Sequence, residues 1–303
     1  MPSIIVEHIA KHFAHVKALD DISFSVDKGE LFGFIGPDGA GKTTLFRILT
    51  TLLIPDEGKA LVNGLDVVRD YRKIRQDIGY MPGRFSLYSD LSVEENLNFY
   101  ATVFGTTVAE NYDLIRDIYI QIEPFKKRKA GKLSGGMKQK LALSCALIHK
   151  PSVLILDEPT TGVDAVSRLE FWEMLKRLKA GGITIVVATP YMDEAGLCDR
   201  VALIQNGKIM TISPPSEVTK TYPWKLFSVR SDDIFNLLND LRKFPRVHTV
   251  FAFGQSAHVS FKEEKADEVA LDIYLREKGH SGLKIGPIVA NIEDCFMELM
   301  MKA

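Results

Sequence analysis

The apolar positions of the first 220 residues fall into short runs separated by longer amphipathic stretches. Every position of residues 153–156 and of residues 185–188 is apolar. A strand without a polar face is buried on both sides, as in a parallel sheet that helices cover. Strands are also predicted at residues 4–8, 22–26 and 31–35. This pattern predicts an α/β fold.

The stretches between the strands have helical spacing. Residues 43–53 are predicted to form a helix that the turn residues from Pro55 to Gly58 stop. A second helix is predicted from about residue 165 to residue 179, ended by Gly181 and Gly182. Helices of this length between apolar strands are typical of a covered parallel sheet.

The pattern breaks after a predicted hairpin. Asn206-Gly207 joins the strands 201–205 and 208–212 as a tight turn, and Ser213-Pro214-Pro215 then continues neither strand nor helix. We place a domain boundary near residues 215–222, which gives a first domain of residues 1–220 and an extension of residues 221–303.

The extension starts a new α+β pattern and contains no motif to which chemistry can be assigned. Its predicted strands are residues 226–230, 247–253 and 257–261, and its predicted helices are residues 232–243, 264–278 and 292–300. Regulation, a dimer contact and support for the fold all remain open as its role.

Composition limits the function classes. The 303 residues are 46% hydrophobic and 25% charged, as in ordinary globular proteins. The net charge of -1 gives no support for bulk binding to nucleic acid, although a small basic patch is compatible with it. Cys145, Cys198 and Cys295 have no metal-ligand spacing, and three cysteines leave at least one unpaired, which fits a reducing compartment. We expect no signal peptide and no membrane span, and therefore a cytoplasmic protein.

A glycine-rich loop follows the strand at residues 31–35. Its sequence is Gly36-Pro37-Asp38-Gly39-Ala40-Gly41-Lys42-Thr43, then Thr44, which matches G-x-x-x-x-G-K-[ST]. Such a loop turns backbone N–H groups toward phosphate oxygens, and the helix that begins at its end adds a positive dipole. We expect Lys42 to reach the β- and γ-phosphates and the Thr43 hydroxyl to bind Mg²⁺.

Two acidic residues end the apolar run of residues 153–156. Asp157 and Glu158 follow it directly, and ligands of open α/β sheets bind at the carboxyl ends of strands. Asp157 is expected to hold Mg²⁺, and Glu158 to polarise an attacking water as a general base. The alternative is that two acids cap a strand in solvent.

A third motif stands between these two. Leu133-Ser134-Gly135-Gly136-Met137-Lys138-Gln139 precedes a helical run to His149, and Glu158 opens the segment Glu158-Pro159-Thr160-Thr161-Gly162-Val163-Asp164. Ser134 can cap a helix, and the two glycines allow close approach to a phosphate. With the phosphate loop, these motifs resemble the ABC ATPases over about residues 3–220.

The resemblance implies a P-loop fold of ABC type, with a mixed sheet core and a helical subdomain at about residues 80–150. It implies that ATP and Mg²⁺ are the cofactors, and that the signature of residues 133–137 faces a nucleotide held by a second ATPase in a head-to-tail dimer. Asp164 would belong to the D-loop. Phe13 would stack on adenine, with packing under the sheet as the alternative.

Two further segments are similar to bacterial drug-exporter ATPases, namely residues 80–97 and residues 292–296. That similarity implies an energy-coupling subunit that docks on a membrane permease at the inner face of the cell membrane. The alternatives are a soluble ABC ATPase acting on DNA or ribosomes and a regulatory pseudo-ATPase that only binds nucleotide. Such soluble ATPases typically have long coiled-coil insertions, zinc modules or tandem ATPase units, and this sequence has none of these.

Two positions depart from the family pattern. The family has Gln after Tyr80-Met81-Pro82, where this chain has Gly83, and His after the strand of residues 183–189, where this chain has Pro190. Proline offers no imidazole and no backbone donor. We therefore expect slow hydrolysis at the chain's own site. A partner ATPase with both residues would make one site active, whereas a homodimer would have two slow sites.

Overall fold

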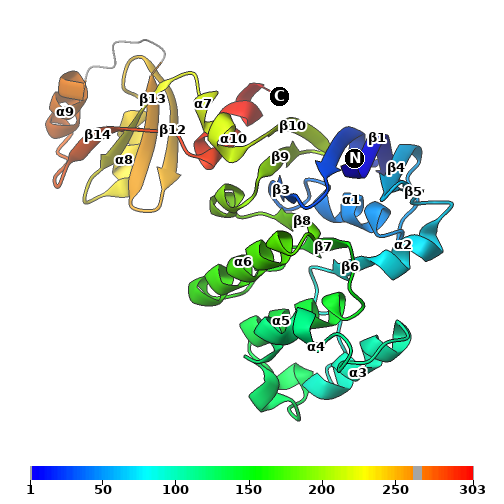
Figure 1. The fold of residues 1–303 in the computed structure, drawn as a ribbon. Helices are drawn as coiled ribbons and strands as arrows, with labels where there is room; N and C mark the ends of the chain where they lie inside the picture. Colours follow the sequence, from blue (N-terminus) through cyan, green and yellow to red (C-terminus); the bar gives the residue numbers. More distant parts are fainter. Residues whose placement is uncertain (1, 262–267, 303) are drawn as a thin grey trace. The chain divides into compact units, whose positions relative to one another are not determined.

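The computed structural model describes residues 2–261 and 268–302 and divides the chain into two compact units, Met1–Pro215 and Ser216–Ala303 (Figure 1). The division follows the proline pair at residues 214 and 215. Pro215 itself begins the short helix α7 (Pro215–Lys220), since proline is well suited to a first helical turn. Each unit has its own sheet and core, and each is described separately below.

The centre of the first unit is a six-stranded sheet in the order β10-β9-β3-β8-β7-β6. Five strands run parallel, and β10 returns antiparallel to β9 through the predicted hairpin. The strands are β3 (Leu31–Ile35), β6 (Ile78–Met81), β7 (Val153–Asp157), β8 (Thr184–Thr189), β9 (Arg200–Gln205) and β10 (Lys208–Ser213). Every residue of β3, β7 and β8 is buried, which confirms the prediction of a covered α/β sheet.

A second, antiparallel sheet has the order β2-β1-β4-β5, with β1 (Pro2–Phe13), β2 (Val16–Asp27), β4 (Glu57–Val62) and β5 (Leu65–Asp66). One hydrophobic core joins both sheets through α1 (Lys42–Leu49), whose Leu45, Phe46, Ile48 and Leu49 are fully buried. Figure 1 shows α1 on one face of the central sheet and α6 (Ala165–Ala180) on the other. The fold is therefore that of a layered P-loop domain.

The predicted helix of residues 43–53 is wrong at its end, because α1 stops at Leu49. The Thr50 hydroxyl donates to the Phe46 carbonyl at 2.8 Å, and Thr51 has a φ of 62°. The backbone N–H groups of Leu52 and Leu53 both turn back to the Arg47 carbonyl. The local hydrogen bonds thus end the helix before the turn residues that the sequence suggested.

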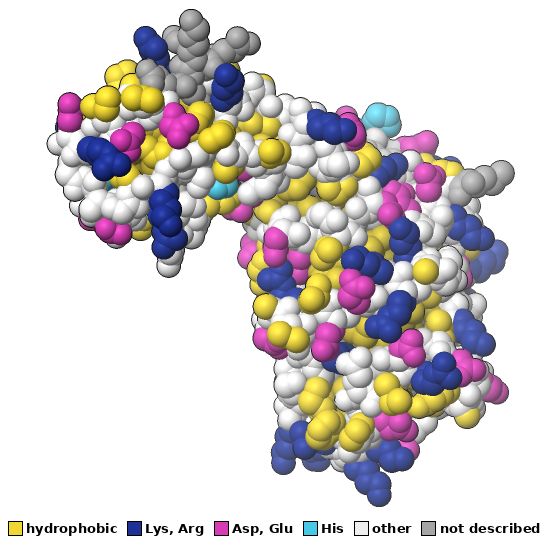
Figure 2. Space-filling model, turned by 60° about the vertical axis from the view of Figure 1, so that its left-hand side comes forward, with side chains coloured by type: hydrophobic (Ala, Val, Ile, Leu, Met, Phe, Trp, Pro, Cys, Tyr) yellow, Lys and Arg dark blue, Asp and Glu magenta, His cyan; other side chains and the backbone are white. Residues whose placement is uncertain are grey.

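The helices α3 (Val93–Val103), α4 (Tyr112–Tyr119) and α5 (Gly135–Leu147) gather at one end of the first unit (Figure 1). Shorter helices are α2 (Tyr71–Asp77), η1 (Glu123–Phe125), η2 (Ala130–Lys132) and η3 (Met192–Leu197). Figure 2 shows mixed charges over the visible face, with Lys and Arg gathered at the end that carries α3 to α5. Among the described residues, no helix has the length and apolar content needed to cross a bilayer.

The second unit contains an antiparallel sheet in the order β12-β13-β11-β14, and helices pack against this sheet. Its elements are β11 (Lys225–Arg230), α8 (Ile234–Leu241), β12 (Val247–Phe253), β13 (Ser256–Phe261), α9 (Glu268–Glu277), β14 (Lys284–Ile288) and α10 (Ile292–Lys302). The α+β pattern agrees with the prediction, and β14 had no sequence signal. The predicted helix of residues 264–278 is seen from Glu268, since residues 262–267 lie outside the described residues.

Candidate functional site

The glycine-rich loop connects β3 to α1 and presses against two other strands. A Cβ added to Gly36 would lie 2.1 Å from the Ile204 carbonyl oxygen, and one on Gly41 would lie 2.5 Å from the Ala18 carbonyl oxygen. Gly41 also has a φ of 104° at the N-terminus of α1. Larger residues at either position would push the loop away, so the glycines hold it between β2 and β9.

The Lys42 ammonium is buried inside this loop. Its Nζ donates to the carbonyls of Gly36 and Pro37 at 2.7 and 3.0 Å, and lies 3.7 Å from Oε1 of Glu158. Burial lowers the pKa of Lys42, and the nearby Glu158 carboxylate opposes that shift. A buried cation that is only partly neutralised is suited to bind an anion such as phosphate.

Thr43 and Asp157 form a pair of oxygen donors beside Lys42. The Thr43 hydroxyl donates to Oδ1 of Asp157 at 3.1 Å. Asp157 is 2% exposed, and burial raises the pKa of its carboxyl. Mg²⁺ prefers oxygen ligands such as carboxylates and hydroxyls. A bound cation would also supply the positive counter-charge that the buried Asp157 carboxylate lacks. These two residues therefore fit a magnesium ion.

Glu158 leaves the end of β7 in an unusual backbone conformation. Its φ is 51°, and its N–H donates to the Ala188 carbonyl at 2.8 Å. The Thr161 hydroxyl lies 3.4 Å from its Oε2. Positive φ in a non-glycine residue is strained, and the contacts to β8 and Thr161 hold it. The carboxylate is thereby fixed beside Lys42.

Lys42, Thr43 and Glu158 line one cavity of about 300 Å³, and Asp157 lies behind Thr43 without lining it. From the predicted set the cavity brings together Gly39, Gly41, Lys42, Thr43, Thr44 and Glu158. Gly36, Pro37, Asp38 and Ala40 shape the loop without lining the cavity; the Ala40 carbonyl, for example, accepts from the Gly207 N–H at 3.0 Å.

The opposite wall contains residues that the sequence analysis missed: Val16, Lys17, Ala18 and Asn206. Asn206 sits in the β9–β10 turn with a φ of 49°. Phe13 does not line the cavity; it is 47% exposed and pairs with Val16 where β1 meets β2. Its stacking on adenine stays a prediction.

The signature forms the start of α5, away from this cavity. The Ser134 hydroxyl accepts from the Met137 N–H at 3.3 Å and caps the helix, and Leu133 is buried. A Cβ on Gly136 would lie 2.8 Å from the Ser167 hydroxyl, and one on Gly135 would lie 3.2 Å from the Gly162 carbonyl oxygen. The two glycines thus let the tip of α5 pack on the segment before α6 and on the first turn of α6.

Asp164 begins α6 beside this contact. Its Oδ1 accepts from the Ser167 N–H at 3.0 Å, which lowers the pKa of the Asp164 carboxyl. Neither Asp164 nor the signature lines the cavity of the phosphate loop. Within one chain, the loop and the signature are therefore separate surfaces.

The two positions that depart from the family pattern are Gly83 and Pro190. A Cβ on Gly83 would lie 3.2 Å from the Asp157 carbonyl oxygen and 3.8 Å from its carboxyl carbon. Gly83 is thus adjacent to the proposed magnesium ligand but has no side chain. Pro190 follows β8, and the neighbouring Thr189 hydroxyl is already committed, because it donates to Oε2 of Glu194 at 2.6 Å.

Arg168 of α6 fixes the segment after Pro190. Its Nε donates to Oε1 of Glu194 at 3.1 Å and its Nη2 to Asp193 at 2.9 Å. The guanidinium also lies 4.3 Å from the centre of the Tyr191 ring. Glu194 is 2% exposed, so Arg168 supplies the counter-charge of a buried carboxylate.

Arg168→Ala is expected to lower the free energy of unfolding by about 2 kcal/mol, because breaking a buried ion pair leaves a charge without its partner. Urea unfolding of the full chain measures this loss. Arg177→Ala is the matched control on the same helix, since Arg177 is exposed and its ion pair with Asp117 is on the surface. Equal effects of the two substitutions would contradict the assigned role.

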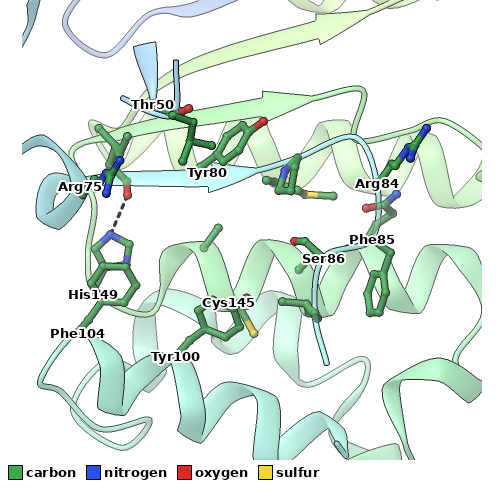
Figure 3. A pocket seen from close by; sticks show the side chains of 18 residues that line it. Thr50, Arg75, Tyr80, Arg84, Phe85, Ser86, Tyr100, Phe104, Cys145 and His149 are labelled. Carbon is green, nitrogen blue, oxygen red and sulfur yellow. Dashed lines mark hydrogen bonds between the residues drawn. The ribbon is translucent and has the colours of Figure 1, made fainter. Parts of the chain in front are cut away.

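A second cavity of about 300 Å³ lies between β6 and the helices α3 and α5. Figure 3 shows Arg84, Phe85 and Ser86 along one side and His149 against the Phe104 ring on the other. The ring centres of His149 and Phe104 are 3.8 Å apart, and Nε2 of His149 bonds the Ile78 carbonyl at 3.0 Å. The cavity begins one residue from Gly83, at Pro82 and Arg84.

Comparison with known proteins gives close matches to this set of motifs. Residues 19–161 match the ABC transporter family. Nod factor export ATP-binding protein I of Burkholderia lata is 34% identical, with 96% of this chain and 95% of that protein aligned. The probable multidrug ABC transporter ATP-binding protein YbhF of Escherichia coli is 38% identical over 93% of this chain, and the chain spans about half (49%) of its length.

Solved structures show the same fold. The cbiO1 protein of Clostridium perfringens is part of an ABC transporter complex. It has a TM-score of 0.65 at 29% identity, and the alignment covers 73% of this chain and 91% of the cbiO1 chain. The dimeric bacterial ABC transporter cassette MJ0796 has a TM-score of 0.64 at 25% identity, covering 70% and 98%. With the phosphate loop, the signature and Asp157-Glu158 in place, the chain belongs to the ATP-binding proteins of ABC transporters, which are P-loop ATPases.

Proposed function

We propose that this chain binds MgATP at the Lys42 cavity and drives an exporter from the inner face of the cell membrane. The observation that carries the proposal is the buried Lys42 ammonium, held by the loop carbonyls 3.7 Å from Glu158. In this assignment Thr43 and Asp157 hold Mg²⁺, which would neutralise phosphate charge. Glu158 orients and deprotonates the attacking water. The export role is supported by the names of the multidrug and Nod factor relatives.

The second ATPase of the proposed assembly completes the site. Ser134, Gly135 and Gly136 present a capped helix tip on a surface separate from the phosphate loop. A helix N-terminus favours a phosphate, so the tip is suited to the nucleotide of a second subunit. A head-to-tail pair would place each signature over the other subunit's loop. ATP would then hold the two subunits together.

The membrane permease is proposed to dock at the second cavity. The lining of this cavity includes Leu87, Tyr100 and Cys145, and Figure 3 shows Arg84 and Phe85 along one side of it. It shares the segment that contains Gly83, which lies against Asp157. A helix that enters the cavity would therefore touch the segment that runs past the magnesium site. This contact provides a short path between permease and nucleotide.

The chain's own nucleotide site is proposed to turn over slowly, and a partner of different sequence is favoured. Gly83 has no side chain and Pro190 has no hydrogen-bond donor for the water or the γ-phosphate, whereas Lys42, Asp157 and Glu158 are in place. Loss of one positioned donor costs about 10²–10³ in rate. A partner with Gln and His at these positions would provide one fast site. Brisk ATP turnover by the purified chain alone would contradict this assignment.

Gly83→Gln combined with Pro190→His is expected to raise the ATP turnover of the isolated chain at least about tenfold, because each change restores a donor to the reacting centre. Steady-state phosphate release measures the effect. A Cβ at residue 83 needs a shift of only a few tenths of an ångström, since its nearest atom is 3.2 Å away. Each single variant serves as a control. An unchanged rate in the double variant would show that the slow step lies elsewhere.

A further inference from the structure

The sheet of the second unit has one face covered by helices and one face only partly covered. Residues of α8 and α9 share a core with Phe227, Val229 and Val259. On the other face, α10 reaches His258, whose Nδ1 lies 2.8 Å from Oδ1 of Asp294. Because Ser228 pairs directly with His258, the side chains of both belong to this second face.

The part of this face beyond α10 is a groove of about 450 Å³. It is lined by Ser228, Arg230, Gln255, Ser256, Lys284, Ile285, Gly286, Pro287 and Ile288. All of these residues belong to the second unit, and no Asp or Glu of the described chain is among them. The groove thus has two cations and no carboxylate in its walls.

The two cations face each other across neighbouring strands. Arg230 of β11 pairs directly with Lys284 of the edge strand β14. Like charges in directly opposite positions of an antiparallel pair repel each other. Asp232, the carboxylate that follows on the chain, does not line the groove and accepts from the Ser281 hydroxyl at 2.8 Å. An anion between the two cations would turn this repulsion into attraction.

Arg230 is also held in place for such a contact. Its Nη2 donates to Oε1 of Gln255 at 2.6 Å, and Gln255 itself lines the groove. A guanidinium has five N–H donors in a planar fork, so one fixed hydrogen bond leaves others able to take a carboxylate or phosphate. Fixing the side chain in advance lowers the entropy cost of binding.

The remaining walls indicate the size and character of the ligand. Ser228 and Ser256 add hydroxyl groups, while Pro287 and Ile288 add apolar surface along the edge strand. A groove of about 450 Å³ is larger than a single phosphate ion needs and falls in the range of small-molecule sites. The walls therefore suit an anionic head attached to a short apolar body.

The geometry points to a binding site for an organic anion, a carboxylate or phosphate with an apolar tail, between Arg230 and Lys284. The site shares no lining residue with the Lys42 cavity, because every residue that lines it lies between Ser228 and Ile288. It gives the extension, for which the sequence contains no chemical motif, a ligand-sensing role. Such a ligand has two sources: a free amphiphile or the headgroup of an anionic lipid.

Calorimetric titration of the full chain with octanoate and octyl phosphate tests the site, with octanol as the uncharged control. We expect saturable binding of an anionic probe and none of octanol. Arg230→Gln and Lys284→Gln should each weaken binding at least tenfold. Lys225→Gln is the matched control on the same strand, because Lys225 is exposed and does not line the groove; it should leave binding unchanged.

Vesicle sedimentation distinguishes the two sources. Binding to phosphatidylglycerol vesicles but not to phosphatidylcholine vesicles, lost in the Arg230 and Lys284 variants, would identify a lipid headgroup. Binding of the free probes without vesicle binding would identify a free amphiphile. The site is excluded if neither anionic probe nor vesicle binds at millimolar concentration, or if the Arg230→Gln/Lys284→Gln double variant binds undiminished.

Thermal unfolding without ligand separates a binding role from a structural one. Lys284→Gln removes one of two opposed like charges, so we expect a midpoint no lower than that of the wild type. A clear decrease in the midpoint would mean that contacts within the chain stabilise the two cations. That result would contradict the proposal that the pair serves to bind an anion.

Discussion

Lys42→Ala is expected to weaken MgATP binding by a factor of about 100 or more. The substitution removes two charge-assisted hydrogen bonds from the ammonium to phosphate oxygens, each of which contributes roughly 1.5–3 kcal/mol, and 1.4 kcal/mol corresponds to a tenfold change in affinity. The ammonium lies within the loop, 2.7 Å from the Gly36 carbonyl oxygen, so a phosphate bound in the loop would contact it directly. Isothermal titration calorimetry of the full chain with MgATP measures the loss.

The control for this substitution is Lys59→Ala, since Lys59 is an exposed lysine of β4 outside the cavity. We also expect the Lys42 variant to remain folded without nucleotide. Burial lowers the pKa of Lys42, which means that its charge is held at a cost in the folded chain. Undiminished MgATP uptake by the folded Lys42 variant would contradict the assigned nucleotide site.

The sequence predicts the glycine-rich loop between β3 and α1 well because its motif lies within one short segment. Gly36 and Gly41 are close in the chain to Lys42 and belong to one motif, although the carbonyls that exclude a Cβ at these positions belong to other strands. The apolar runs that became β7 and β8 carry no polar face, so their burial on both sides follows from composition alone. Patterns that lie within one segment can thus be predicted without a structure.

The opposite wall of the cavity depends on long-range pairing and had no comparable signal. Asn206 reaches the loop because β9 runs beside β3, with Gly33 opposite Val201, over a separation of more than 160 residues. Val16 lines the cavity, whereas Phe13, its direct partner in the β1–β2 hairpin, does not. Neither register can be derived from the spacing of apolar residues in a single strand.

The extension shows the same limit. The edge strand β14 contains Gly286 at its centre, followed by Pro287, and has an irregular apolar pattern, which gave no strand signal. Its pairing with β11 nevertheless creates the opposed cations Arg230 and Lys284. In sequence these residues are more than 50 positions apart, so the groove between them exists only once the sheet is formed.

Glu158→Gln is expected to reduce ATP hydrolysis by a factor of about 10²–10⁴, the usual contribution of a positioned general base. The amide keeps the size of the side chain but cannot take a proton from water. MgATP binding should persist, since Lys42, Thr43 and Asp157 are untouched. Because turnover of the unmodified chain is itself expected to be slow, single-turnover measurement with labelled ATP is needed, in both the wild-type and the Gly83→Gln/Pro190→His backgrounds.

The same variant tests the proposed dimer, because ATP that is bound but not hydrolysed should hold two subunits together. Size-exclusion chromatography with light scattering should show a dimer in MgATP and a monomer without it. Adding Ser134→Arg should abolish the dimer, since Ser134 caps the helix tip that would face the partner's phosphates. Glu173→Gln, an exposed residue of α6, is the control for both assays. Hydrolysis that survives Glu158→Gln would assign the base to another group, and a dimer that survives Ser134→Arg would place the interface away from the signature.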